Sequence, residues 1–277
     1  MMAAMGKTKV LLATFSNPFF NWLPYPVGCL ISYARKNPRI EENYEFLTPL
    51  FEPIDYHESI FKGVEILGLT NYVWNQGFND KLSQRFRAYN PKGKIIYGGP
   101  NVPENEEDAK EYKKIRPFVD IFFMGPGEES FESFLLSLLD GKRADFPGTF
   151  GPHWQGQRLS RKDYDMSDPP APYVDGLFDS WLAKHDSLGM IIETNRGCPF
   201  RCSFCDWGSM TRARIHKFEL AKVLESIEKM LRHSNIQRLY IADANFGFFP
   251  EDLEIIKFIA QMKKKLKRHF YIVFCAY

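Results

Sequence analysis

The sequence predicts an α/β protein with a doubly wound, Rossmann-like parallel sheet in its first half and the first strands of a β/α barrel in its second half. Short apolar runs alternate with helical patterns on both sides of residue 150, and such runs are typical of strands buried on both faces. Parallel neighbours need crossover helices, which the alternation supplies. Glycines and polar residues cluster directly after several of the runs.

Five apolar runs predict the strands of the first domain, which we place at residues 1–140. The expected strands are residues 10–14, 44–47, 64–69, 94–97 and 121–124, and the expected helices are residues 29–35, 80–89, 104–115 and 131–139.

Polar residues and glycines follow three of these strands at their carboxyl ends, where ligands bind in open parallel sheets. They are Thr70, Asn71, Gly98, Gly99, Pro100, Gly125, Gly127 and Glu128. Glycine permits positive φ and a close approach of the backbone to a ligand. For any single glycine a strand-to-helix turn is the preferred explanation, but three such turns on one edge favour a ligand site. No Gly-x-Gly-x-x-Gly follows the first strand, which argues against a dinucleotide site.

Residues 141–187 are expected to link the domains, with a small hairpin between residues 149–151 and 157–159. The proline-rich stretch from residue 168 to residue 173 excludes helix and central strand, because proline lacks the N–H donor and has a fixed φ.

The second domain, residues 188–277, is expected to contain three strands. These are residues 190–192, 238–241 and 271–275, with helices starting at residue 218 and spanning residues 253–266. Three strands would leave an open apolar edge, which soluble proteins avoid. We therefore expect an incomplete barrel, from a split or truncated reading frame or from a subunit completed by another chain.

Three of the five cysteines, Cys198, Cys202 and Cys205, lie within eight residues after the strand at 190–192. Clustered thiolates suit an iron–sulfur cluster or zinc. Zinc would need a fourth ligand, for which His216 is the nearest candidate, whereas a cluster would leave one iron open. Structural or disulfide-bonded cysteines are a weaker alternative, because the neighbouring residues are polar.

The Cys-x-x-x-Cys-x-x-Cys spacing, with Phe204 before the last cysteine, resembles the signature of radical S-adenosylmethionine (SAM) enzymes. The resemblance implies that the three cysteines hold a 4Fe–4S cluster whose fourth iron binds SAM. Reductive cleavage of SAM at that cluster would yield a 5′-deoxyadenosyl radical, and no catalytic residue beyond the cluster is assigned.

The resemblance also implies SAM contacts in two loops. They are Phe204, Trp207 and Gly208 in the cysteine loop, and Asp243 and Asn245 after the next strand. A helix cap before Glu251 explains Asp243 and Asn245 equally well.

The order of the first-domain motifs resembles the cobalamin-binding domain that precedes many radical SAM barrels, over roughly residues 9–140. The eight turn residues named above are its implied cobalamin contacts, and the family-like string Ala-Pro-Tyr-x-Asp-Gly recurs at residues 171–176. The Asp-x-His-x-x-Gly string that ligates cobalt in some cobalamin domains is missing. The nearest match, at Asp55, lacks the glycine, and His57 is expected at the surface or at a helix start.

The implied function is that of a cobalamin-dependent radical SAM enzyme that transfers methyl groups to an unactivated carbon. The alternatives are a radical rearrangement or methylthiolation enzyme, and a non-catalytic, truncated module that binds cobalamin or an iron–sulfur cluster. The expected partners are a small-molecule or natural-product substrate, a flavodoxin or ferredoxin as electron donor, and a second chain that completes the barrel.

Composition argues against other partners. Lys and Arg total 36 against 34 for Asp and Glu, a net charge of +2 that creates no field for nucleic acid or an anionic membrane. No apolar run approaches the ~18 residues that span a bilayer, and the N-terminus does not resemble a signal peptide. We expect a cytoplasmic protein with reduced thiols.

Overall fold

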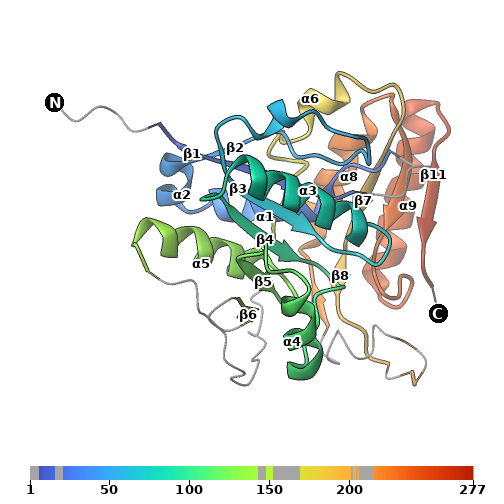
Figure 1. Cartoon of the computed structure of the whole chain (residues 1–277). Coiled ribbons are helices and arrows are strands. Elements are labelled where there is room, and N and C mark those ends of the chain that lie inside the picture. The colour runs from blue at the N-terminus through green and yellow to red at the C-terminus, as the bar shows by residue number, and fades with distance from the viewer. Residues whose placement is uncertain are drawn as a thin grey trace. The chain divides into compact units, whose positions relative to one another are not determined.

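The computed structural model describes residues 6–15, 21–142, 148–151, 169–200, 202–203, 205 and 215–276 (Figure 1). The described residues form two compact units. The first unit contains residues 6–15, 26–142 and 148–151, and the second contains residues 21–25 and the described residues from 169 onward.

The first unit is built on a six-stranded sheet in the order β2-β1-β3-β4-β5-β6. Its strands are β1 (Thr8–Ala13), β2 (Tyr44–Phe46), β3 (Val64–Thr70), β4 (Lys94–Gly98), β5 (Ile121–Phe123) and β6 (Thr149–Phe150). The neighbours from β2 to β5 are parallel, and β6 is antiparallel to β5.

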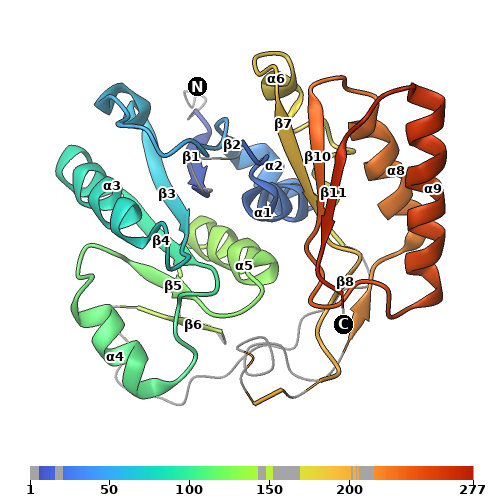
Figure 2. The same ribbon diagram turned by 90° about the vertical axis from the view of Figure 1, so that its right-hand side faces the viewer.

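Helices cover both faces of this sheet, with α3 and α4 on one face and α1 and α5 on the other (Figure 2). The helices are α1 (Tyr25–Arg35), α2 (Pro38–Asn43), α3 (Gln76–Tyr89), α4 (Glu106–Lys114) and α5 (Glu128–Leu139), with a 3-10 helix, η1 (Glu58–Phe61). The doubly wound sheet expected from the sequence is thereby confirmed, with all five predicted strands in place.

The core of the first unit comes from the apolar runs that predicted its strands. Leu67, Ile95, Tyr97 and Phe122 of the sheet pack with Phe86 of α3, and all five side chains are fully buried. Burial of each aliphatic or phenylalanine side chain stabilises the fold by roughly 1.5–3 kcal/mol. The rigid sheet positions the turns at its carboxyl edge.

Two features of the first unit differ from expectation. Helix α2 was not predicted; the Asn37 side chain accepts a hydrogen bond from the Arg39 N–H at its start, where Pro38 supplies helical φ. Strand β6 pairs with β5, while the predicted hairpin partner, residues 157–159, lies outside the described residues.

The second unit contains a parallel sheet in the order β11-β10-β7, at the positions that the sequence predicts. Its elements are β7 (Leu188–Ile192), β10 (Ile236–Ile241), β11 (Tyr271–Phe274), α6 (Asp179–Leu182), α8 (Leu220–Leu231) and α9 (Pro250–Leu266). Helices α8 and α9 lie side by side on one face of the sheet (Figure 2).

The two outer strands of this sheet have different surroundings. Gly189 of β7 exchanges backbone hydrogen bonds with the segment 21–23. A Cβ at Gly189 would lie 2.3 Å from the Trp22 ring, so the close approach of this segment requires glycine. In the described part of the chain, β11 pairs on one side only and exposes Tyr271, Val273 and Phe274. The open apolar edge expected from the sequence is therefore present.

No helix among the described residues is long and apolar enough to cross a membrane.

Candidate functional site

The three clustered cysteines follow the carboxyl end of β7. Cys198 comes after the short strand β8 (Asn195–Arg196) and is buried, Cys202 is exposed, and Cys205 is half-buried. The Cys205 N–H donates to the Cys202 carbonyl at 3.0 Å, which closes a tight turn between these two cysteines. None of the three forms a disulfide in the structure.

Cysteine thiolates are the ligands of iron–sulfur clusters, and this loop supplies three of them. Within the described residues, no three Cys, His, Asp or Glu side chains are grouped closely enough to hold a metal ion. The predicted SAM contacts Phe204, Trp207 and Gly208 lie outside the described residues, as do residues 201 and 206–214.

A short antiparallel ladder closes the base of the cysteine loop. Strand β8 pairs with β9 (His216–Lys217), which places His216 opposite Arg196. The Phe218 N–H donates to the Thr194 carbonyl at 2.9 Å and extends this closure. The two ends of the loop are therefore held together by backbone hydrogen bonds.

Asp243, after β10, holds the entry of the loop. Its buried carboxylate accepts hydrogen bonds from the Thr194 N–H at 2.7 Å and the Asn195 side-chain amide at 2.8 Å, and also from the Thr194 hydroxyl. Burial raises the pKa of Asp243 to about 7, and the negative charge of Glu193 adds to the shift, while the hydrogen bonds from Thr194 and Asn195 oppose it.

The helix-cap alternative for Asp243 is not observed. At the start of α9, the carboxylate of Asp252 accepts from the Gly247 N–H at 2.8 Å and from the Phe249 N–H at 2.9 Å. Asn245 instead donates from its side-chain amide to the Cys198 sulfur at 3.2 Å. The structure therefore brings two predicted SAM-loop residues to the cysteine loop.

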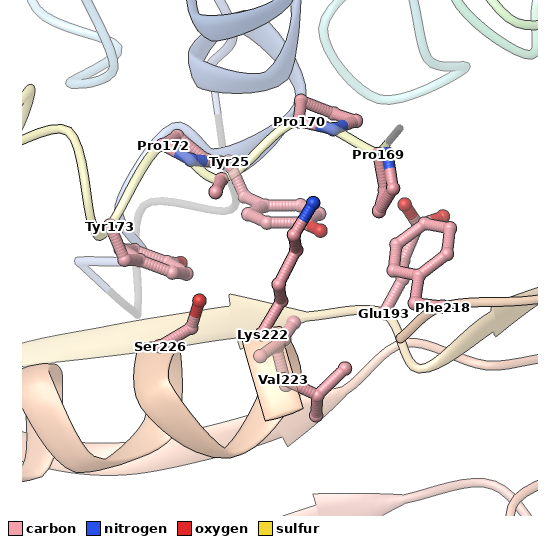
Figure 3. Close-up of a pocket in the computed structure, with 12 residues that line it drawn as sticks. Tyr25, Pro169, Pro170, Pro172, Tyr173, Glu193, Phe218, Lys222, Val223 and Ser226 are labelled. Atoms are coloured by element: carbon pink, nitrogen blue, oxygen red, sulfur yellow. The ribbon is translucent and has the colours of Figure 1, made fainter. Parts of the chain in front are cut away.

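The proline-rich segment anchors β7 and lines a small pocket (Figure 3). The Tyr173 hydroxyl donates to the Ile191 carbonyl at 2.6 Å and accepts from the Ile191 N–H at 3.0 Å. Lys222 rises from α8 towards Pro170 in the pocket. The cavity volume of about 20 Å³ holds roughly one water molecule, so this pocket is too small for an organic substrate.

The predicted cobalamin residues gather at the carboxyl edge of the first unit. The Asn71 N–H donates to the Gly98 carbonyl at 2.6 Å, which joins the turns after β3 and β4. Gly99 has φ +96°, and a Cβ there would lie 2.7 Å from the Asn71 carbonyl oxygen. Gly125 has φ +65° after β5, and Glu128 is buried at the first position of α5. Thr70, Gly127 and Pro100 lie in the same three turns.

Sequence reasoning missed an asparagine network beside this edge. Asn79 donates to the Asn71 side-chain oxygen at 2.9 Å and the Thr70 carbonyl at 3.1 Å, and Asn75 accepts from the Tyr72 N–H at 2.8 Å. Of these three asparagines, Asn79 alone lies within α3, so no helical spacing pointed to the network.

Two aromatic residues, Tyr72 and Trp74, lie between Asn71 and Asn75 in the sequence and form an exposed aromatic surface. The Tyr72 and Trp74 rings stack at a centroid distance of 4.5 Å, and Trp74 is 63% exposed.

His57 precedes η1, and its side chain accepts a hydrogen bond from the Ser59 N–H at 3.2 Å, which confirms its interpretation as a helix-start residue.

The first unit is a Rossmann-like sheet with glycines and polar residues at its carboxyl edge, and the second unit is a parallel sheet followed by a loop with three cysteines. No family model matches the chain. The chain is 32% identical to the cobalamin-dependent radical SAM methyltransferase TokK of Streptomyces tokunonensis, over 96% of this chain and 40% of that protein. It is 31% identical to 2-(S-pantetheinyl)-carbapenam-3-carboxylate methyltransferase of Streptantibioticus cattleyicolor, over 94% of this chain and 39% of that protein.

Two solved structures share the fold. The radical SAM methyltransferase TsrM of Kitasatospora setae aligns with TM-score 0.65 and 17% identity, over 96% of this chain and 54% of that one. The cobalamin-dependent radical SAM enzyme OxsB aligns with TM-score 0.68 and 20% identity, over 97% of this chain and 38% of that one. The chain is thus similar over nearly its whole length to these two methyltransferases, and it spans about two fifths of their length.

Proposed function

We propose that the chain is the cofactor-binding part of a cobalamin-dependent radical SAM methyltransferase that acts on a small-molecule substrate. The observation that carries the proposal is the loop of three free thiols, Cys198, Cys202 and Cys205, at the carboxyl end of β7. The relationship to TokK over nearly the whole chain supports it.

When bound, the 4Fe–4S cluster and SAM supply the radical chemistry, and cobalamin supplies a transferable methyl group. The chain's own residues bind and orient these groups. The three thiolates would ligate three irons. Phe204, Trp207 and Gly208 are the proposed SAM contacts within the cysteine loop, and Asp243 and Asn245 flank its entry.

In the first unit, the turns after β3, β4 and β5 would hold cobalamin. Gly99 and Gly125 let the backbone approach the ligand without a side chain in between. The stacked rings of Tyr72 and Trp74 offer a planar apolar surface to the corrin ring. A flavodoxin or ferredoxin would supply the electron, and a second polypeptide would pair with the exposed edge of β11.

The test is anaerobic reconstitution of the protein with iron, sulfide and hydroxocobalamin, followed by removal of unbound cofactor. We expect about four irons per chain, corrin absorbance, and a change in the electron paramagnetic resonance spectrum of the reduced cluster when SAM is added. A protein that binds zinc through four protein donors, with no iron, would contradict the proposal.

The corrin spectrum separates this function from its rivals. A rearrangement or methylthiolation enzyme that does not use cobalamin would retain iron but no corrin. A non-catalytic module would bind one or both groups and show no spectral response to SAM.

A further inference from the structure

The segment after β10, residues 243–249, contacts the arm of the cysteine loop that carries Cys198. The Asn245 side-chain amide lies 3.2 Å from the Cys198 sulfur, in hydrogen-bonding geometry with the amide as donor. Two residues beyond Cys198, the Phe200 ring packs edge-on against Phe248, with a centroid distance of 5.8 Å and an interplanar angle of 85°. This arm is therefore held by a polar contact and an aromatic contact from the same segment.

The far arm of the loop is held by the next residues of the chain. The Lys217 ammonium lies 3.9 Å from the centroid of the Phe249 ring and 3.0 Å from the carboxylate of Glu251. The start of α9 therefore supports the exit of the cysteine loop, while Asn245 and Phe248 support its entry.

The backbone around Asn245 is anchored on both sides. The Phe246 N–H donates to the Cys275 carbonyl at 2.7 Å, and the buried Phe246 ring packs against Phe274 of β11 at a centroid distance of 5.3 Å. Before Asn245, the carboxylate of Asp243 is fully engaged with Thr194 and Asn195. The amide donor is therefore presented to the sulfur from a fixed position.

We propose that Asn245 is a positioning residue whose amide hydrogen bond to the Cys198 sulfur raises the reduction potential of the cluster, an inference that rests on the proposed function. A hydrogen bond to a ligating thiolate withdraws negative charge from it, and the reduced cluster carries more negative charge than the oxidised one. The bond therefore stabilises the reduced state. Without it, reduction requires a stronger donor.

The test uses reconstituted protein and redox titration followed by electron paramagnetic resonance. Asn245→Leu keeps the side-chain size but removes the donor, and Asn245→Asp removes the donor and adds a negative charge. Gln237→Glu is the matched control, because Gln237 lies on β10, the strand that precedes Asn245, and its amide donates to the Ser234 carbonyl at 2.9 Å. We expect full iron content in all three variants, a midpoint potential shifted to more negative values in both Asn245 variants, and a larger shift in Asn245→Asp than in Asn245→Leu.

The control variant should keep the wild-type potential. Full iron content with unchanged potentials in both Asn245 variants would overturn the role of Asn245. Loss of iron from Asn245→Leu with a wild-type circular dichroism spectrum would also overturn it, because the amide would then be needed for cluster retention instead of for its potential. A wild-type protein that takes up no iron would overturn the proposed function itself, which distinguishes the two failures.

Discussion

Gly98 ends β4 and Gly99 follows it, but the two glycines differ in what a side chain would meet. At Gly99 a Cβ would approach the Asn71 carbonyl oxygen to 2.7 Å at φ +96°, whereas at Gly98 the nearest atom, Phe123 Cβ, is 3.7 Å away. We expect Gly99→Ala to lower the free energy of unfolding by about 1–3 kcal/mol, because alanine is strained at positive φ.

Urea unfolding at 25 °C measures this difference, with Gly98→Ala as the matched control, which should change stability by much less. Equal effects of the two substitutions would contradict the assigned strain at Gly99.

The pKa of Asp243 gives a prediction with a definite sign. Burial raises this pKa from 3.8 to about 7, so between these pH values the folded chain holds a proton that the unfolded chain has lost. The contribution of Asp243 to stability is then fully present below pH 4 and is lost as the pH rises through 7.

The melting temperature of the metal-free protein, measured from pH 5 to pH 8 against Asp243→Asn, isolates this group. We expect the wild-type value minus the variant value to fall as the pH rises. A difference that grows with pH would show that the pKa of Asp243 is lowered instead.

For single residues, the sequence identifies the candidates for the site but not the residues that they contact. The spacing of Cys198, Cys202 and Cys205 stands out without a structure, and the position of Asp243 and Asn245 after a strand selects them as site candidates. Asp243 meets Thr194 across 49 positions of sequence, and Asn245 meets Cys198 across 47. Those contacts depend on the register of β7 and β10, which the apolar pattern does not specify.

Among the elements, strand β7 depends on a side chain from outside the sheet. The Tyr173 hydroxyl bonds to both the N–H and the carbonyl of Ile191. Tyr173→Phe leaves both backbone groups without this partner, so we expect a loss of about 1–3 kcal/mol in the free energy of unfolding.

Tyr271→Phe is the control, because Tyr271 is 72% exposed on β11 and its substitution should be nearly neutral. Chemical denaturation followed by circular dichroism compares the two variants. A Tyr173→Phe variant as stable as Tyr271→Phe would contradict the anchoring role.

Element prediction succeeded where burial is continuous. The runs that became β3 and β4 are apolar over several residues because both faces of the sheet are covered by helices. Strands β8 and β9 have two residues each, which is too short for any periodicity, so the ladder that closes the cysteine loop could not be predicted. The start of α1 at Tyr25, four residues before its predicted start, lies in a proline-containing stretch that reads as a loop.

For the whole molecule, the two proposed cofactor sites lie in separate compact units. We therefore expect that a substitution in one site leaves cofactor binding at the other site unchanged. Gly99→Val should lose bound corrin and keep its iron, because the larger side chain fills the space beside Asn71. Absorbance spectra and iron assays of the same preparation report both losses, and a parallel loss of iron and corrin in this variant would contradict independent sites.

The central claim is that the cysteine loop holds an iron–sulfur cluster, and iron content after anaerobic reconstitution tests it most directly. The variant in which Cys198, Cys202 and Cys205 are all replaced by alanine should lose the iron and the sulfur-to-iron charge-transfer absorbance. Cys275→Ala, at an exposed cysteine outside the loop, should retain both. Unchanged iron content in the triple variant would contradict the account.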